Sequence, residues 1–353
     1  KSITFNTFLK SQAEYFIKKG FNVEVACSDI KNLKLKNNLK HFINFPTNIL
    51  NLFNIKKHIS VYNQIRILVK KNPTALFYLH TPVASHLFRF FNFFNRLKII
   101  YFVHGFRFTS ISHPIKFFFF KAIEKILSFK TDVFITINNE DYNYTKLNLK
   151  KKKSLCYKIN GVGLDLTKRN FKKKIKRKNG IKEILVIAAY KKEKGYLEIL
   201  KVAEMLKNHK IKITCYGSGE YSNFNSIKLK KKLSNIFFNN FDKNLSKKIK
   251  NFDILLHLSK REGLPVSVMQ SLSEGLPVIC YNIRGNNDLV KDNINGYFVK
   301  TYKDVMNKIH YLNLEKNFFN EMKINALKSI DKDFSQKMIN LKLLNIIKYY
   351  QKF

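Results

Sequence analysis

The chain lacks any long apolar run. Across its 353 residues no stretch approaches the roughly 20 uncharged apolar residues that a membrane-spanning helix needs. The first residues also lack the succession of charged, apolar and small residues that marks a secretory signal. We therefore expect a cytoplasmic protein without a transmembrane helix.

Cysteine is scarce. The four cysteines lie far apart in the sequence and show no spacing typical of a metal site. Three of them fall inside apolar, strand-like runs, which favours free thiols over disulfides. We predict buried, unpaired thiols at Cys27, Cys156, Cys215 and Cys280.

Acidic residues are few beside the basic ones, with 24 Asp and Glu against 66 Lys and Arg, a net charge of +42. Such a charge is compatible with a nucleic acid, an anionic membrane surface or a nucleotide ligand as partner. An AT-rich genome, which enriches Lys, Asn, Ile, Phe and Tyr, explains the same composition without any binding. Because no nucleic-acid-binding motif is found, we expect no nucleic-acid partner and keep the membrane surface as the main functional alternative.

Short β-branched apolar runs alternate with segments of helical periodicity along the whole chain. This alternation is typical of parallel sheets covered by helices on both faces. The fold class we predict is α/β, with two doubly wound, Rossmann-like domains that face each other across a cleft. The predicted strands are 22–27, 75–80, 98–104, 132–138, 156–159, 183–189, 211–216, 235–238, 253–258 and 277–281.

Residues 1–162 are predicted to form the first domain and residues 181–335 the second. A basic stretch without apolar periodicity makes 163–180 the expected connection between them. The helix predicted within 336–353 is a candidate to pack back across the first domain. A leading strand and its loop are missing from the pattern of the first domain, so we expect the amino end to be that of a fragment.

The segment Ser259–Gln270 carries the clearest chemical signal. It follows the apolar run 253–258 and places Glu262, Gly263 and Pro265 at a predicted helix start, with Pro265 as the first helical residue. The N–H groups of Leu264, Val266 and Ser267 would then be available to an anion such as a phosphate. An ordinary strand-turn-helix with a solvated glutamate is the alternative interpretation.

This segment resembles the E-x7-E region of retaining nucleotide-sugar glycosyltransferases of the GT-B fold, in particular glycosyltransferase family 4 (group 1). Further matches in the same order extend the resemblance over nearly the whole chain. The matches around residues 104–108 and 262–265 resemble enzymes of capsule, exopolysaccharide or lipopolysaccharide assembly. The matching motifs are His80-Thr81-Pro82, residues 101–106, 136–142 and 161–165, Glu193-Lys194-Gly195, Gly217-Ser218-Gly219, Arg284-Gly285-Asn286 and Asn295-Gly296.

The resemblance implies transfer of a sugar from a nucleotide-diphosphate sugar, a UDP-sugar by expectation, to a glycan or lipid-linked glycan at the inner face of the membrane. The first domain would then be the acceptor side and the second the nucleotide-sugar side. The leaving phosphate would accept the acceptor's proton, and no metal or other cofactor is expected. The implied catalytic residues are His104, Lys194 and Glu262, and the implied donor-binding residues are Gly263, Leu264, Pro265, Val266, Gln270, Gly217, Asn240 and Phe241.

Two positions depart from the family pattern. Ala189 stands where an arginine usually precedes the lysine by five residues, and Gln270 stands where a second glutamate is usual. A neutral amide loses a charge-assisted hydrogen bond, which weakens binding without abolishing chemistry; Lys191 or Lys192 is a candidate to replace the missing arginine. Two alternatives stay open: a nucleotide-sugar 2-epimerase, which has the same architecture, and a non-catalytic binding protein, which the two departures and the missing first strand suggest.

The segment 113–132 combines a run of phenylalanines with flanking lysines. Its apolar positions follow helical spacing. Such a helix either packs on the first sheet or lies on a bilayer surface, and one helix can do both with its two faces.

Overall fold

A computed structural model describes residues 2–31, 33–34, 40–43, 55–108, 113–167 and 180–351. The chain divides into two compact units. Unit 1 consists of residues 1–163 and 335–353, and unit 2 of residues 164–334. Most of the predicted connection, including the basic residues 168–178, lies outside the described residues.

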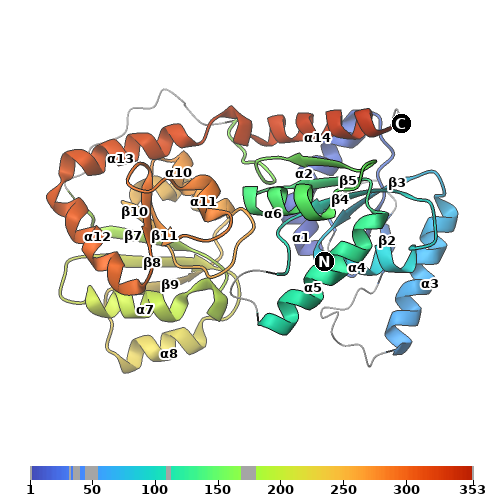
Figure 1. Cartoon of the computed structure of the whole chain (residues 1–353). Coiled ribbons are helices and arrows are strands. Elements are labelled where there is room, and N and C mark those ends of the chain that lie inside the picture. Colours follow the sequence, from blue (N-terminus) through green and yellow to red (C-terminus); the bar gives the residue numbers. More distant parts are fainter. Residues whose placement is uncertain are drawn as a thin grey trace. The chain divides into compact units, whose positions relative to one another are not determined.

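Unit 1 contains a parallel sheet in the strand order β3-β4-β5-β6 and a separate parallel pair, β1-β2 (Figure 1). The central strand β4 is almost continuously apolar because helices cover it on both faces. The strands are β1 (Val25–Cys27), β2 (Lys40–Phe42), β3 (Leu76–His80), β4 (Lys98–Val103), β5 (Val133–Thr136) and β6 (Leu155–Lys158). The helical segments are α1 (Ser2–Thr4), η1 (Phe5–Leu9), α2 (Lys10–Lys18), α3 (Ile55–Lys71), α4 (Pro82–Phe91), α5 (Pro114–Leu127), η2 (Ser128–Lys130), α6 (Asn139–Tyr144), η3 (Thr145–Leu149) and α14 (Gln336–Gln351).

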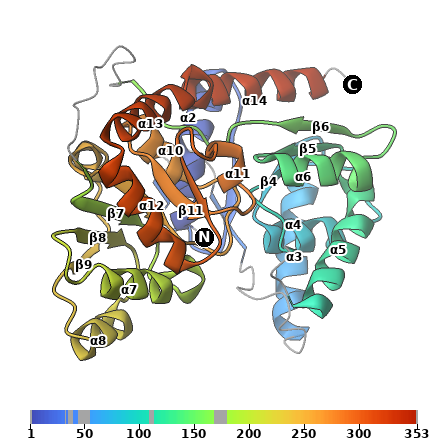
Figure 2. The same ribbon diagram turned by 60° about the vertical axis from the view of Figure 1, so that its left-hand side comes forward.

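Unit 2 is a six-stranded parallel sheet in the order β12-β11-β10-β7-β8-β9. Helices α7 and α8 cover one face, and α10 and α13 the other (Figures 1 and 2). The strands are β7 (Glu183–Ile187), β8 (Lys212–Gly217), β9 (Ile236–Asn240), β10 (Ile254–His257), β11 (Val278–Tyr281) and β12 (Gly296–Val299). The helical segments are η4 (Lys192–Lys194), α7 (Tyr196–Met205), α8 (Ser222–Lys230), α9 (Leu245–Lys248), η5 (Ile249–Asn251), α10 (Val266–Ser273), α11 (Asn286–Leu289), α12 (Tyr302–Leu314), α13 (Lys316–Ser329) and η6 (Lys332–Phe334).

The predicted strands coincide with β1 and β3–β11 to within a few residues. Two short strands, β2 and β12, were not predicted. The segment before β1 is helical from Ser2 to Lys18. Helix α14 packs against α2, and Asn340 donates a hydrogen bond to the carbonyl of Ser11. All four cysteines are free; Cys27, Cys215 and Cys280 are buried as expected, whereas Cys156 is half-buried.

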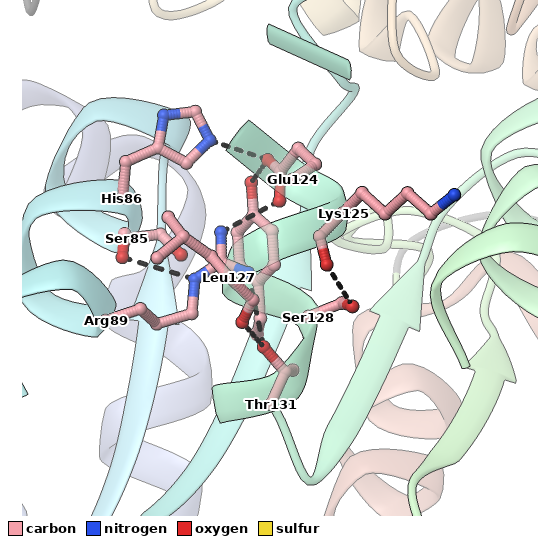
Figure 3. Close-up of polar contacts among 9 residues, drawn as sticks. Ser85, His86, Arg89, Glu124, Lys125, Leu127, Ser128 and Thr131 are labelled. Carbon is pink, nitrogen blue, oxygen red and sulfur yellow. Dashed lines mark hydrogen bonds and ion pairs between the residues drawn. The ribbon is translucent and has the colours of Figure 1, made fainter. Parts of the chain in front are cut away.

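A buried ionic cluster joins α4 to α5 inside unit 1 (Figure 3). The Glu124 carboxylate accepts a hydrogen bond from Arg89 Nη2 at 2.9 Å, and His86 Nε2 lies 2.7 Å from its other oxygen. Burial alone would raise the pKa of Glu124, but Arg89 and His86 outweigh it and lower the pKa to about 2. Because breaking a buried ion pair costs about 3–5 kcal/mol, the cluster fixes how α5 is rotated against α4.

Within the described residues, no helix is both long and apolar enough to cross a bilayer.

Candidate functional site

The strand order of unit 2 reverses between β7 and β10. Starting from β7, the chain adds β8 and β9 on one side and then β10, β11 and β12 on the other. In such sheets ligands bind at the carboxyl ends of the two strands where the order reverses, because the loops that follow them diverge. Lys194 follows β7 and Glu262 follows β10, so these two predicted residues lie on either side of this point.

Lys194 and Glu262 form an ion pair there. Lys194 Nζ lies 2.6 Å from Glu262 Oε1, and only 23% and 13% of the two side chains are exposed. The buried side chain of His257, the last residue of β10, places Nε2 3.3 Å from the same oxygen. Burial alone would raise the pKa of Glu262, but His257 and Lys194 together lower it to about 2. The carboxylate is therefore ionised throughout the physiological pH range.

The backbone of this loop is fixed by close contacts. Arg284 Nε donates to the carbonyl of Glu262 at 3.1 Å. Gly285 has φ +81°, and a Cβ atom there would lie 2.2 Å from the carbonyl oxygen of Gly263. At Gly195, with φ +80°, a Cβ atom would lie 2.1 Å from the carbonyl oxygen of Leu258. Only glycine lets these turns approach the loop so closely, which explains the glycines of both motifs.

Helix α10 begins immediately after this loop, one residue later than predicted. Pro265 is its N-cap, with extended backbone angles (φ −72°, ψ 117°), and Val266 is its first residue. The expectation that Pro265 is the first helical residue was wrong, because its carbonyl already accepts from Met269 while its own ψ stays extended. No side chain caps α10, so the N–H groups of Val266 and Ser267 lie in a turn without internal acceptors.

The remaining predicted residues of unit 2 lie along the same edge of the sheet. Gln270 is half-buried on the second turn of α10. Gly217 and Asn240 end β8 and β9 and are paired in register. Phe241 follows directly and is 65% exposed, which leaves its ring available for contact with a planar group. Gly217 has no room for a side chain, since a Cβ atom would lie 2.1 Å from the carbonyl oxygen of Ala188.

His104 belongs to unit 1. It follows β4, and its Nε2 lies 3.0 Å from Nδ1 of His80 at the end of β3. Burial lowers the pKa of His104 to about 4. Its imidazole is therefore neutral at physiological pH and can serve as a hydrogen-bond donor or acceptor, but not as a cation.

Two residues at the unit 2 site were missed by the sequence reasoning. His257 was hidden inside an apolar strand, although a histidine at the carboxyl end of a strand is a usable signal. Arg284 was noted only as part of a motif. Lys191 and Lys192, the candidates for replacing the arginine absent at Ala189, are exposed.

Comparison with known proteins bears on both units. Residues 167–329 match the family model of glycosyl transferases group 1, and residues 2–138 match that of glycosyl transferase 4-like proteins. The Escherichia coli UDP-Gal:alpha-D-GlcNAc-diphosphoundecaprenol alpha-1,3-galactosyltransferase is 26% identical over 316 residues, covering 79% of this chain and 76% of its own. The Staphylococcus aureus capsular polysaccharide biosynthesis glycosyltransferase CapM is 22% identical over 364 residues, covering 94% and 90%.

A solved structure is similar over both units. The complex of Anabaena Alr3699/HepE with UDP-glucose has a TM-score of 0.74 over 96% of this chain and 94% of its own, at 12% identity. At this identity the similarity concerns the fold. Each unit is a Rossmann-like α/β domain, as predicted. Together, the two family matches, the fold and the ordered motifs show that this enzyme belongs to the group 1 glycosyltransferases of the GT-B fold.

Proposed function

We propose that this glycosyltransferase transfers a sugar from a UDP-sugar, with retention of configuration, to a hydroxyl of a glycan or lipid-linked glycan in bacterial surface polysaccharide assembly. One observation carries the proposal: a partly buried lysine-carboxylate pair lies at the strand reversal of unit 2, beside the uncapped start of α10. The cation and the N–H groups suit a diphosphate, and the carboxylate suits sugar hydroxyls.

Each group has a distinct role in this proposal. Lys194 leaves Glu262 for the donor diphosphate and stabilises the charge that grows there as the glycosidic bond breaks. The N–H groups at the start of α10 bind the same phosphates, in place of a metal ion. Glu262 accepts hydrogen bonds from hydroxyls of the sugar, and His257 remains beside its carboxylate. Gln270 binds the ribose through its amide.

Three further residues complete the proposed donor site. Asn240 and Phe241 contact the base, Asn240 through its backbone and Phe241 through its exposed ring. Neutral His104 of unit 1 exchanges a hydrogen bond with the donor sugar, as the family resemblance implies.

Names of similar proteins support the donor and the acceptor. The Escherichia coli relative uses UDP-Gal and a diphosphoundecaprenol-linked acceptor, and its product linkage is alpha. The Anabaena structure contains UDP-glucose. Because the common UDP-hexoses are α-configured, an α-linked product corresponds to retention. In the step we propose, the acceptor oxygen bonds to the anomeric carbon, the bond to the diphosphate breaks on the same face, and the diphosphate accepts the proton. A lipid-linked acceptor would bring the enzyme to the inner face of the membrane.

The proposal is tested by titrating the purified protein with UDP and uridine, and by identifying products from a panel of UDP- and GDP-sugars. We expect Lys194→Met to weaken UDP binding about tenfold to a hundredfold, since a charge-assisted hydrogen bond contributes about 1.5–3 kcal/mol. Uridine binding should change little. Lys207→Met, which removes an exposed lysine of unit 2, is the matched control.

The outcomes separate the alternatives. Failure to bind any nucleotide would contradict the site. Conversion of a UDP-sugar without an acceptor would indicate the epimerase. Nucleotide binding without turnover on any donor and acceptor would indicate a non-catalytic protein. An NMR spectrum of the product reports the anomeric configuration, and a β-linked product from an α-configured donor would exclude retention.

A further inference from the structure

Helix α5 is apolar on two opposite sides. Its inner side is buried in unit 1 through Phe120 and Leu127. Its outer side carries large apolar residues that remain exposed: Ile115 is 74% exposed, and Phe118 67%. Positions 115, 118, 119, 122 and 126 follow the spacing of one helical face, which continues into η2. We call Ile115, Phe118, Phe119, Ile126 and Phe129 the α5 surface.

The rotation of α5 is set from inside. Glu124 points inward to Arg89 and His86, while Lys125 extends away from that cluster (Figure 3). The α5 surface therefore cannot turn into the core without breaking a buried ion pair. Figures 1 and 2 show α5 on the outside of unit 1, next to α4.

The segments that form this surface are rich in basic residues. Between residues 82 and 131 the sequence contains a single acidic residue, and that is the buried Glu124. Lys116 and Lys125 flank the apolar stripe on α5, and Lys151 Nζ lies 4.0 Å from the centre of the Phe129 ring. Segment η3, which packs against α5, adds an exposed Leu147 and is followed by the lysine run 150–153.

We propose that the α5 surface docks on an anionic lipid bilayer. Aromatic and aliphatic side chains would enter the headgroup region, and each nearby lysine would add about 1 kcal/mol of attraction to anionic lipid. A protein partner would have to supply an acidic rim around an apolar groove, whereas a bilayer with anionic headgroups supplies both features everywhere. Docking would place the proposed transfer reaction at the membrane surface. Binding of the protein to the bilayer can be measured without any catalytic turnover.

Co-sedimentation with vesicles tests this docking surface. The full chain is mixed with vesicles of phosphatidylcholine alone, or of phosphatidylcholine with phosphatidylglycerol. We expect binding to the anionic vesicles that decreases with added salt. The double variant Phe118→Ser/Phe129→Ser removes two exposed rings and should lower the affinity about tenfold or more. Leu229→Ser, which removes a similarly exposed apolar residue of unit 2, is the control.

Two results would overturn the inference: equal affinity for both kinds of vesicle, or the same loss with Leu229→Ser as with the double variant. Association of the pure protein into oligomers that the double variant abolishes, without vesicle binding, would assign the surface to a second copy of the chain instead. UDP titration of each variant separates these results from a failure of the proposed function, because the altered residues lie outside the proposed donor site.

A second, independent observation concerns His80. Its Nδ1 and the Nε2 of His104 share one hydrogen bond of 3.0 Å. Burial, and then the neighbouring His104, lower the pKa of His80 well below its ordinary value, so both rings are neutral. Two neutral imidazoles in contact have one proton between them, which links their tautomers.

The backbone beside His80 is strained. Thr81 has φ 64° and ψ 137°, a combination that is costly for a β-branched residue, at about 1–3 kcal/mol. It connects β3 directly to α4, whose first residue is Pro82. Such strain persists only where the surrounding structure imposes it, and here it accompanies a histidine held at the end of its strand.

We infer that His80 is a positioning residue that couples the tautomer of His104 to its own and leaves Nδ1 of His104 for a ligand. The role of that ligand as the donor sugar rests on the proposed function. With ¹⁵N-labelled histidine, long-range ¹⁵N–¹H spectra report the tautomer directly and without substrate. We expect the fraction of His104 that is protonated on Nε2 to equal the fraction of His80 that is protonated on Nε2, and the tautomer of His104 to change in His80→Phe. An unchanged His104 tautomer in His80→Phe would refute the inference.

Discussion

The ion pair between Lys194 and Glu262 gives the sharpest test of the site in the protein without ligand. We expect Lys194→Met to destabilise unit 2, because Glu262 would keep its charge in a mostly buried position with only His257 beside it. In the double variant Lys194→Met/Glu262→Gln the unpaired carboxylate is gone. The double variant should therefore lose less stability than the sum of the losses in the two single variants.

The size of the effect follows from the pKa of Glu262. A decrease in the pKa from 4.5 to about 2 corresponds to a net stabilisation of the carboxylate by about 3 kcal/mol. This net value is the attraction from His257 and Lys194 minus the cost of burying the charge. The pair is partly exposed, so we take about 1–2 kcal/mol for the loss of Lys194, between the value of about 0–1 kcal/mol for a surface ion pair and about 3–5 kcal/mol for breaking a buried one. We expect this loss in Lys194→Met and a coupling energy of about 1 kcal/mol in the double-mutant cycle.

Hydrogen exchange of the amides in β7 and β10 measures this stability within unit 2 alone. A local measurement is needed because a chain of two units need not unfold in a single step, so that global unfolding would not report on unit 2 alone. Lys207→Met again serves as the exposed control. Strictly additive effects of the two single variants would refute the reasoning, since they would mean that Lys194 and Glu262 do not interact in solution.

The other predictions concern glycine, a buried acid and pH. Gly285→Ala should displace the loop at Gly263 and cost about 1–3 kcal/mol, measured by the same amide exchange, whereas Gly20→Ala, which has φ +86° but open space around it, should show only the backbone strain of about 1 kcal/mol. Glu124→Gln should cost about 3–5 kcal/mol, with faster exchange in α5; a neutral effect would show that the cluster is dispensable. Because the pKa of Glu262 is about 2 when folded and ordinarily 4.5, its stabilisation is complete above pH 4.5 and disappears as the pH falls towards 2. The difference in urea stability between the native protein and Glu262→Gln should decrease over that window, and a constant difference would contradict the assignment.

Much of the fold could be predicted from the sequence, because parallel strands buried on both faces give near-continuous apolar runs. Ten strands were located in this way. The short β2 and β12 were not, because three or four residues carry too little pattern. The boundary at Pro265 was wrong by one residue, since a proline can serve equally as the N-cap or as the first helical residue.

Part of the candidate site could also be predicted from the sequence. Glu262 and Lys194 were found because each stands in a motif with glycine after an apolar strand. His257 and Arg284 were not, because their importance depends on what they contact: one meets the carboxylate of Glu262 and the other its carbonyl. No local pattern encodes such a contact.

The sequence by itself determined the α/β class, the two-domain organisation, the basic composition and the group 1 motifs, because all of these are periodicities or short local signatures. Only the tertiary structure decided which residues meet. Lys194 and Glu262 are 68 positions apart and touch because β7 and β10 are neighbours in the sheet. Likewise, Phe118 and Phe119 of α5 face outward because Glu124 is held inside by Arg89 and His86. Local sequence encodes the helices and strands, whereas long-range contacts determine which strands pair and which face of a helix is buried.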